Sequence, residues 1–217
     1  MFLEHFDAAE KHLRAIGEQP RTEPGCAVTA AELDEVERII DRSIPPELRA
    51  FFHEMGDGYR FTPDEEQNGF GVGFLSDYRY NVAGFADSIY EDLPPQEHRR
   101  QPRELLELEL QRRRNWFPFY NFGCGGYIFC LDSTAEGNCL CYYDVRWPGY
   151  PPEFWRATIG NSLLDFIRQW SRFCFSDPVT PDGHHIDLTI LAGRLTGRFD
   201  WNPKNFGARF DRGTTEA

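Results

Sequence analysis

Histidine, cysteine and acidic residues mark the positions at which this sequence could carry out chemistry. His184, His185 and Asp187 form one compact group of imidazole and carboxylate side chains, the groups that bind zinc or transfer protons. The zinc-binding histidines of a metalloprotease helix stand at i and i+4, whereas these two are adjacent. The surrounding residues are typical of a loop. An enzyme that uses this group is therefore the least favoured of the three functions that we consider.

The cysteines are candidates for metal binding or nucleophilic catalysis. There are six, Cys26, Cys124, Cys130, Cys139, Cys141 and Cys174. The spacings C-x5-C and C-x-C differ from the paired C-x2-C of common structural zinc sites. Cys124 lies between glycines that a tight turn explains, and no sequence signature supplies a histidine partner. We predict reduced thiols that act as small core side chains, with no metal, no cofactor and no catalytic residue.

Two further patterns resemble functional motifs only superficially. Glu104 and Glu107 share one face of a helix predicted over 103–114, but that segment is so rich in charge that a solvated face explains them. The Gly71-Val72-Gly73 sequence is too short to be a phosphate-binding loop. Neither pattern therefore predicts an active site.

Helical periodicity predicts the elements that surround these residues. Apolar side chains recur at helical spacing over 2–16, and the Thr-x-x-Glu sequence at Thr29 is a capping box that opens a helix to about Ile40. We expect its inward residues to be Leu33, Val36, Ile39 and Ile40. Pro45 and Pro46 suit the opening of the next helix, with Leu48, Phe51, Phe52 and Met55 buried. Asn161 or Ser162 opens a final helix with a broad apolar side.

The predicted sheet centre is a β-hairpin. Two apolar runs, 127–131 and 139–143, flank a polar loop at 132–138. Shorter strands are predicted at 59–61, at 70–75, where glycines weaken the strand, and at 153–158. A short helix is predicted at 83–90. The chain from 177 onwards has no clear period.

Composition limits the classes of function. Residues 1–110 hold 11 basic and 24 acidic side chains, and the whole chain has a net charge of −12. Nucleic-acid binding is disfavoured, because phosphate contacts need a basic surface. An acidic surface instead keeps a protein soluble or attracts a basic partner. No apolar run is long enough to span a membrane and the N-terminus lacks a signal-peptide pattern, so we expect no membrane association and a cytoplasmic location.

Five segments occur in the order that is typical of the SUKH superfamily (Smi/Knr-like). They are TAAELDEVE at 29–37, IPPELRAFFHEMGDGYRF at 44–61, NWFPFYNFGCGGYIFCLD at 115–132, CLCYYDV at 139–145 and NSLLDFIRQW at 161–170. The chain resembles this superfamily over residues 27–173. The resemblance implies an α+β fold with a single mixed, mostly antiparallel β-sheet flanked by helices. We divide the chain into an N-terminal helix and linker (1–26), a SUKH-like domain (27–176) and a C-terminal extension (177–217).

The resemblance also implies a function. Bacterial SUKH proteins are immunity proteins that bind and neutralise a cognate protein toxin, and these toxins include nucleases. The alternative is a non-enzymatic scaffold or regulatory module of the Smi/Knr type. For the immunity function we expect contacts from exposed acids and aromatics in loops. The candidates are Asp57, Tyr59, Asp64, Glu65, Glu66, Asp77, Tyr78 and Tyr80.

Overall fold

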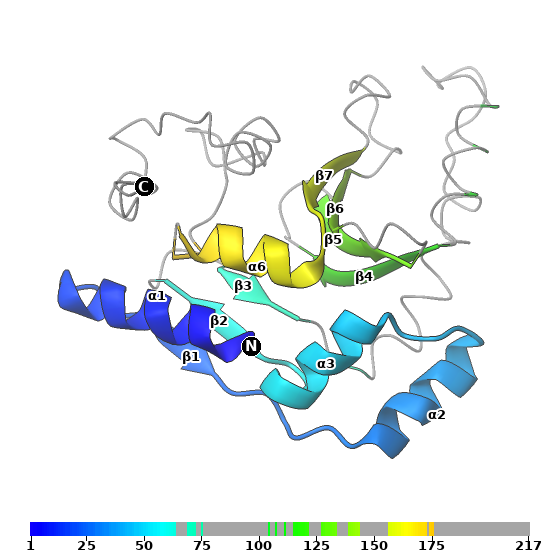
Figure 1. The fold of residues 1–217 in the computed structure, drawn as a ribbon, viewed down its shortest axis with the longest axis horizontal. Helices are drawn as coiled ribbons and strands as arrows, with labels where there is room; N and C mark the ends of the chain where they lie inside the picture. The colour runs from blue at the N-terminus through cyan, green and yellow to red at the C-terminus, as the bar shows by residue number, and fades with distance from the viewer. Residues whose placement is uncertain are drawn as a thin grey trace.

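Within its described residues, the computed structural model has four helices and seven strands with defined bounds, and Figure 1 shows their arrangement. The described residues are 1–63, 69–72, 75, 104, 107, 111, 115–121, 127–133, 139–143, 156–172 and 174–175. The helices are α1 (Leu3–Ala15), α2 (Ala30–Ile40), α3 (Pro46–Met55) and α6 (Leu163–Ser171). The strands are β1 (Arg21–Glu23), β2 (Arg60–Thr62), β3 (Phe70–Gly71), β4 (Trp116–Asn121), β5 (Tyr127–Asp132), β6 (Cys139–Tyr143) and β7 (Arg156–Gly160). The predicted helix at 83–90 and the segment 177–217 lie outside the described residues.

Local side-chain chemistry fixes the start of three helices. The Thr29 hydroxyl accepts a hydrogen bond from the N–H of Glu32, whose carboxylate accepts one from the N–H of Thr29, which completes the predicted capping box. Pro46 occupies the first turn of α3, where no intrahelical N–H donor is needed. The hydroxyl of Ser162 caps α6 by accepting from the N–H of Asp165 at 3.1 Å.

The strands confirm the α+β class, and among the described residues they form two antiparallel sheets rather than one. The smaller sheet has the order β1-β2-β3 and the larger sheet has the order β4-β5-β6-β7. The predicted hairpin is confirmed, because β5 pairs with β6 in register from Tyr127↔Tyr143 to Leu131↔Cys139. β3 ends at Gly71, earlier than predicted. β1 lies within the predicted linker that precedes residue 27.

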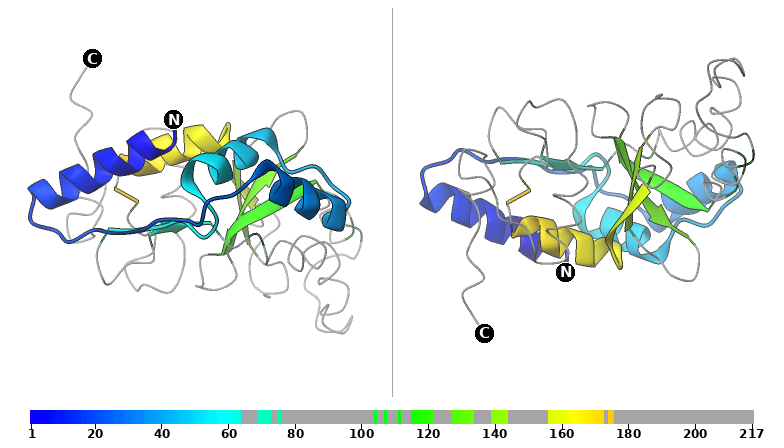
Figure 2. Two further views of the ribbon diagram at one scale, coloured as in Figure 1. Left: turned by 90° about the horizontal axis from the view of Figure 1, so that it is seen from below. Right: turned by 90° about the horizontal axis from the view of Figure 1, so that it is seen from above.

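One aromatic core joins the helices to both sheets. Phe6 of α1 stacks on Phe175 with ring centroids 4.4 Å apart and also contacts Phe70 of β3. Trp170 of α6 contacts Phe70 on the small sheet and Phe129 on the large sheet, at 5.8 and 5.7 Å. α1 and α6 lie side by side over one face of the small sheet (Figures 1 and 2). Residues 1–26 therefore contribute to the same core as the rest of the described chain.

Two of the burial predictions are wrong. Ile39 is 40% exposed, because the inward stripe of α2 consists of Leu33, Val36 and Ile40 and Ile39 lies to one side of it. Cys26 is also exposed, since it lies in the extended segment before α2. Cys130 and Cys174 are buried, as predicted.

Candidate functional site

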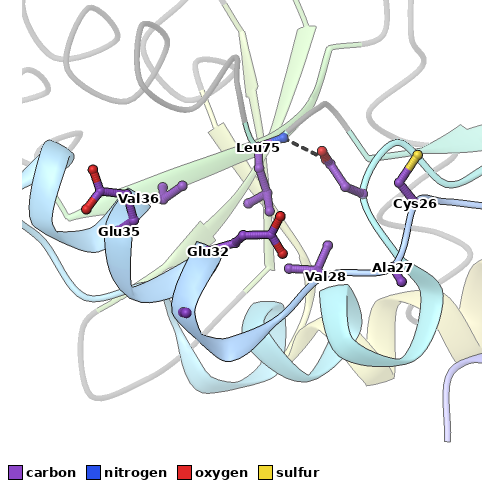
Figure 3. A pocket seen from close by; sticks show the side chains of 9 residues that line it. Cys26, Ala27, Val28, Glu32, Glu35, Val36 and Leu75 are labelled. Atoms are coloured by element: carbon purple, nitrogen blue, oxygen red, sulfur yellow. Dashed lines mark hydrogen bonds between the residues drawn. The ribbon is translucent and has the colours of Figure 1, made fainter.

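The candidate site is a groove of about 450 Å³ beside the first two turns of α2. Its described lining residues come from the segment before α2, from α2 itself and from two positions further along the chain. They are Cys26, Ala27, Val28, Ala31, Glu32, Glu35, Val36, Asp57 and Leu75. Figure 3 shows the side chains of Val28, Glu32 and Leu75 pointing into the same space.

The α2 wall carries two carboxylates in defined surroundings. Oε2 of Glu32 accepts hydrogen bonds from the backbone N–H and the hydroxyl of Thr29, both at 2.8 Å. These bonds stabilise the ionised form and lower the pKa of Glu32. Glu35 forms a bidentate ion pair with Arg38, at 2.7 and 2.8 Å. Glu32 is therefore ionised at neutral pH, and both acids lie on the face of α2 that lines the groove.

The opposite wall is built by a backbone bridge. Cys26 and Asp57 exchange two hydrogen bonds between their N–H and C=O groups, each 2.8 Å long. The Asp57 carboxylate also accepts a hydrogen bond from the N–H of Leu75 at 2.6 Å, which is the dashed line in Figure 3. Asp57 therefore holds together two segments that line the groove.

Two glycines permit the backbones at this bridge to meet. A Cβ atom added to Gly56 would lie 2.6 Å from the carbonyl carbon of Gly25, and one added to Gly25 would lie 2.4 Å from that of Gly56. Gly56 also has a φ of +85°, which other residues rarely adopt. Side chains at either position would force the two segments apart.

Apolar and acidic groups are combined in this groove. Val36 and Leu75 are buried and form apolar surface inside it. Glu32, Glu35 and Asp57 supply three carboxylates, and no lysine or arginine is among the described residues that line it. Such a surface suits a cation that is attached to an aliphatic stem.

Among the predicted contact residues that the structure describes, one lines this groove. It is Asp57, whose carboxylate is partly occupied by Leu75. Asp64, Glu65, Glu66, Asp77, Tyr78 and Tyr80 lie outside the described residues, as do His184, His185, Asp187 and Cys124. Glu104 and Glu107 are described and are helical.

Tyr59 is not available for contact with a partner. Its side chain is only 3% exposed, and its ring packs against Phe6 at 4.9 Å and Phe51 at 6.3 Å. The hydroxyl has no hydrogen-bond partner among the described residues. The prediction of an exposed contact is therefore wrong for this residue, because Tyr59 faces the aromatic core.

A second cavity of about 410 Å³ lies where α3, α6 and the end of β5 meet. Its lining includes Ser43, Glu47, Asp132 and Ser162. Oε2 of Glu47 accepts a hydrogen bond from the N–H of Leu163 at 2.6 Å, so this acid connects α3 to the first turn of α6. We interpret this cavity as a structural junction.

Metal-binding clusters and membrane-spanning helices are absent from the described part of the chain. It contains no group of three or more His, Cys, Asp or Glu side chains that could hold a metal ion. None of its helices combines the length and hydrophobicity needed to cross a bilayer. The groove itself has carboxylates and one thiol but no histidine among its described lining residues. Its described lining therefore offers charged and apolar contacts.

Sequence reasoning assigned the groove residues to other roles. The capping-box pattern explains Glu32, and helical periodicity predicts Ile39 to be a core residue. The available signal was spacing, because Glu32, Glu35, Val36 and Ile39 fall at i, i+3, i+4 and i+7 on one helical stripe. Leu75 could not be found in this way, since its place depends on a contact with Asp57, distant in sequence.

The described residues thus define an α+β protein with an acidic groove, and comparison with known proteins assigns its family. The sequence model of the SMI1 / KNR4 family (SUKH-1) matches residues 27–169. The chain belongs to this family. No curated protein and no solved structure matches it significantly. The matched range omits α1, although Phe6 of that helix lies in the centre of the core.

Proposed function

We propose that this chain is an immunity protein that binds a cognate bacterial toxin and blocks it by occlusion. The observation that carries the proposal is membership of the SMI1 / KNR4 family (SUKH-1) over residues 27–169. In this account the protein acts in the cytoplasm as a binding protein and not as an enzyme. Its partner is a protein toxin, and nucleases are among the candidates.

The charge of the chain supports a basic partner. The excess of acids lies in residues 1–110, and the groove beside α2 belongs to this half. A nuclease active site must accommodate phosphate and is commonly basic, so an acidic surface can cover it. Electrostatic attraction of this kind speeds association and weakens as salt rises.

The types of side chain that line the groove also support the proposal. The carboxylates of the groove lie among apolar side chains, and the described lining contains no histidine that could act as a base toward the Cys26 thiol. A preformed mixed surface of this kind is suited to partner binding. A scaffold or regulatory module of the Smi/Knr type would share this property, so the two functions differ in the partner rather than in the surface.

Growth rescue tests the proposal. A candidate toxin domain, sought among the genes next to that of this chain, is induced in a sensitive host, with the full chain or an empty vector expressed in the same cells. We expect the chain to restore plating by at least about tenfold. The double variant Glu65→Lys/Glu66→Lys should restore less growth, and Asp7→Lys, an exposed acid on α1, should act like the wild type. Absence of rescue together with binding to several unrelated proteins would favour the scaffold function.

A further inference from the structure

An exposed apolar side chain extends the groove along α2. Glu32, Glu35 and Val36 line the groove, and Ile39 is the next residue on the same helical stripe. Ile39 is 40% exposed although it is large and apolar. Ile39 does not pack into the core, because Leu33, Val36 and Ile40 occupy the buried face of the helix. The groove and Ile39 therefore form one continuous surface, which we call the α2 surface.

The apolar part of the α2 surface is held in place by hydrogen bonds. Leu75 is fixed by the bond from its N–H to the Asp57 carboxylate, and Asp57 is fixed by its two backbone bonds to Cys26. The first turn of α2 is fixed by the capping box of Thr29 and Glu32. A preformed surface loses little conformational entropy when it binds, which favours affinity.

The charged part of the α2 surface carries an excess of negative charge. The described lining contains three acids and no basic residue. Glu35 is paired with Arg38, but the Arg38 side chain is 72% exposed, and exposed ion pairs of this kind contribute little to stability. Oε1 of Glu32 has no hydrogen-bond partner among the described residues, since both bonds to Thr29 use Oε2. A cation from a partner can therefore be accepted at Oε1 of Glu32 without displacing a hydrogen bond from a described residue.

We propose that the α2 surface binds a segment of the partner that presents an arginine or lysine next to an aliphatic side chain. The cation pairs with Glu32 and Glu35, and the aliphatic group packs on Val36, Leu75 and Ile39. The volume of about 450 Å³ lies within the range of about 300–1,000 Å³ that is usual for ligand pockets. This inference rests on the proposed function, because it specifies where and through what chemistry the toxin is recognised.

Peptide titration followed by NMR tests the site without the toxin. The probe is an acetylated and amidated tetrapeptide of alternating leucine and arginine, added to the isotope-labelled full chain. We expect saturable amide shifts at Val28, Glu32, Val36, Ile39 and Leu75, with a dissociation constant below about 1 mM. A peptide with glutamine in place of arginine, and one with glycine in place of leucine, should each bind at least about threefold more weakly.

Matched variants separate the α2 surface from general charge. Glu35→Lys should weaken peptide binding at least about threefold, whereas Asp7→Lys, the same change on α1, should not. Ile39→Ala should weaken it to a similar degree, whereas Ile16→Ala, at a side chain that is 47% exposed at the C-terminal end of α1, should not. A native-like spectrum of each free variant shows that it is folded.

Failure of the α2 surface to bind the peptide can be distinguished from failure of the immunity function. No saturable shift at the α2 surface, or equal weakening by Glu35→Lys and Asp7→Lys, overturns the inference. If this occurs while the wild-type chain still rescues growth, the immunity function stands and uses another surface. If the peptide binds as expected but no rescue is seen, the surface is supported and its partner is not a toxin.

Discussion

The carboxylate of Asp57 accepts a hydrogen bond from the backbone N–H of Leu75 at 2.6 Å. The same residue exchanges two backbone hydrogen bonds with Cys26, so one aspartate connects three segments of the chain around the groove. An exposed acid in a Gly-Asp-Gly turn is, by sequence alone, a candidate for partner contact. In the structure, its carboxylate instead holds the backbone of Leu75, which lines the groove.

This role predicts a loss of stability when the carboxylate of Asp57 is removed. Asp57→Ala should lower the free energy of unfolding by about 1–2 kcal/mol, because a partly buried N–H loses a charged acceptor. Asp57→Asn, which keeps an acceptor oxygen, should retain most of the stability. Urea unfolding measures both values, and hydrogen exchange at the amide of Leu75 reports the bond directly. Unchanged exchange in Asp57→Ala would contradict the assignment.

The contact between Gly25 and Gly56 predicts a large effect of a single methyl group. Gly56→Ala should destabilise the fold by more than about 3 kcal/mol, because the added Cβ would overlap the backbone of Gly25 at a positive φ. Gly17→Ala is the matched control, since Gly17 also has a positive φ, +91°, but its Cβ would meet nothing within 4 Å. We expect that control to lose only about 1 kcal/mol in thermal unfolding. Equal losses in the two variants would show that backbone conformation alone matters.

The capping box at Thr29 predicts a dependence of stability on pH. The pKa of Glu32 is lowered by hydrogen bonds from Thr29, so the stabilisation is complete above the unfolded-state pKa and is lost as pH falls through the folded-state pKa. Glu32→Gln should therefore be less stable than the wild type near neutral pH, and the difference in Tm should shrink between about pH 5 and about pH 3. A difference that stays constant over this range would refute the linkage.

The buried hydroxyl of Tyr59 predicts a stabilising substitution. No described residue satisfies this group, and burial raises its pKa, with the nearby charges of Asp7 and Glu10 acting in the same direction. Tyr59→Phe should keep the aromatic contacts with Phe6 and Phe51 and raise the free energy of unfolding by about 1 kcal/mol. Chemical denaturation measures the change. A loss of stability would instead reveal a bound water or another partner for the hydroxyl.

The sequence predicted those parts of the fold that depend on local chemistry. The Thr29 cap, the Pro46 helix start and the Ser162 cap each use a side chain and a backbone group only a few residues apart. The hairpin of β5 and β6 was also predicted, since its strands are adjacent in sequence and strongly apolar. Family resemblance over most of the chain is confirmed by the match to residues 27–169.

The structural features that the sequence did not predict depend on contacts between distant segments. β1 is a polar tripeptide whose strand conformation comes from pairing with β2, some forty residues later. The exposure of Ile39 follows from which face of α2 packs on the core, and the burial of Tyr59 follows from the position of α1. The groove also depends on contacts of this kind. Helical periodicity could therefore indicate the wall that α2 forms, but not the opposite wall.

Titration of the toxin's own activity against the purified full chain tests the immunity function most directly. The account predicts stoichiometric loss of activity at low salt, weaker inhibition as salt rises, and a flatter salt dependence for Glu35→Lys than for Asp7→Lys. Full toxin activity in the presence of excess chain, at low salt and with both proteins folded, would contradict it.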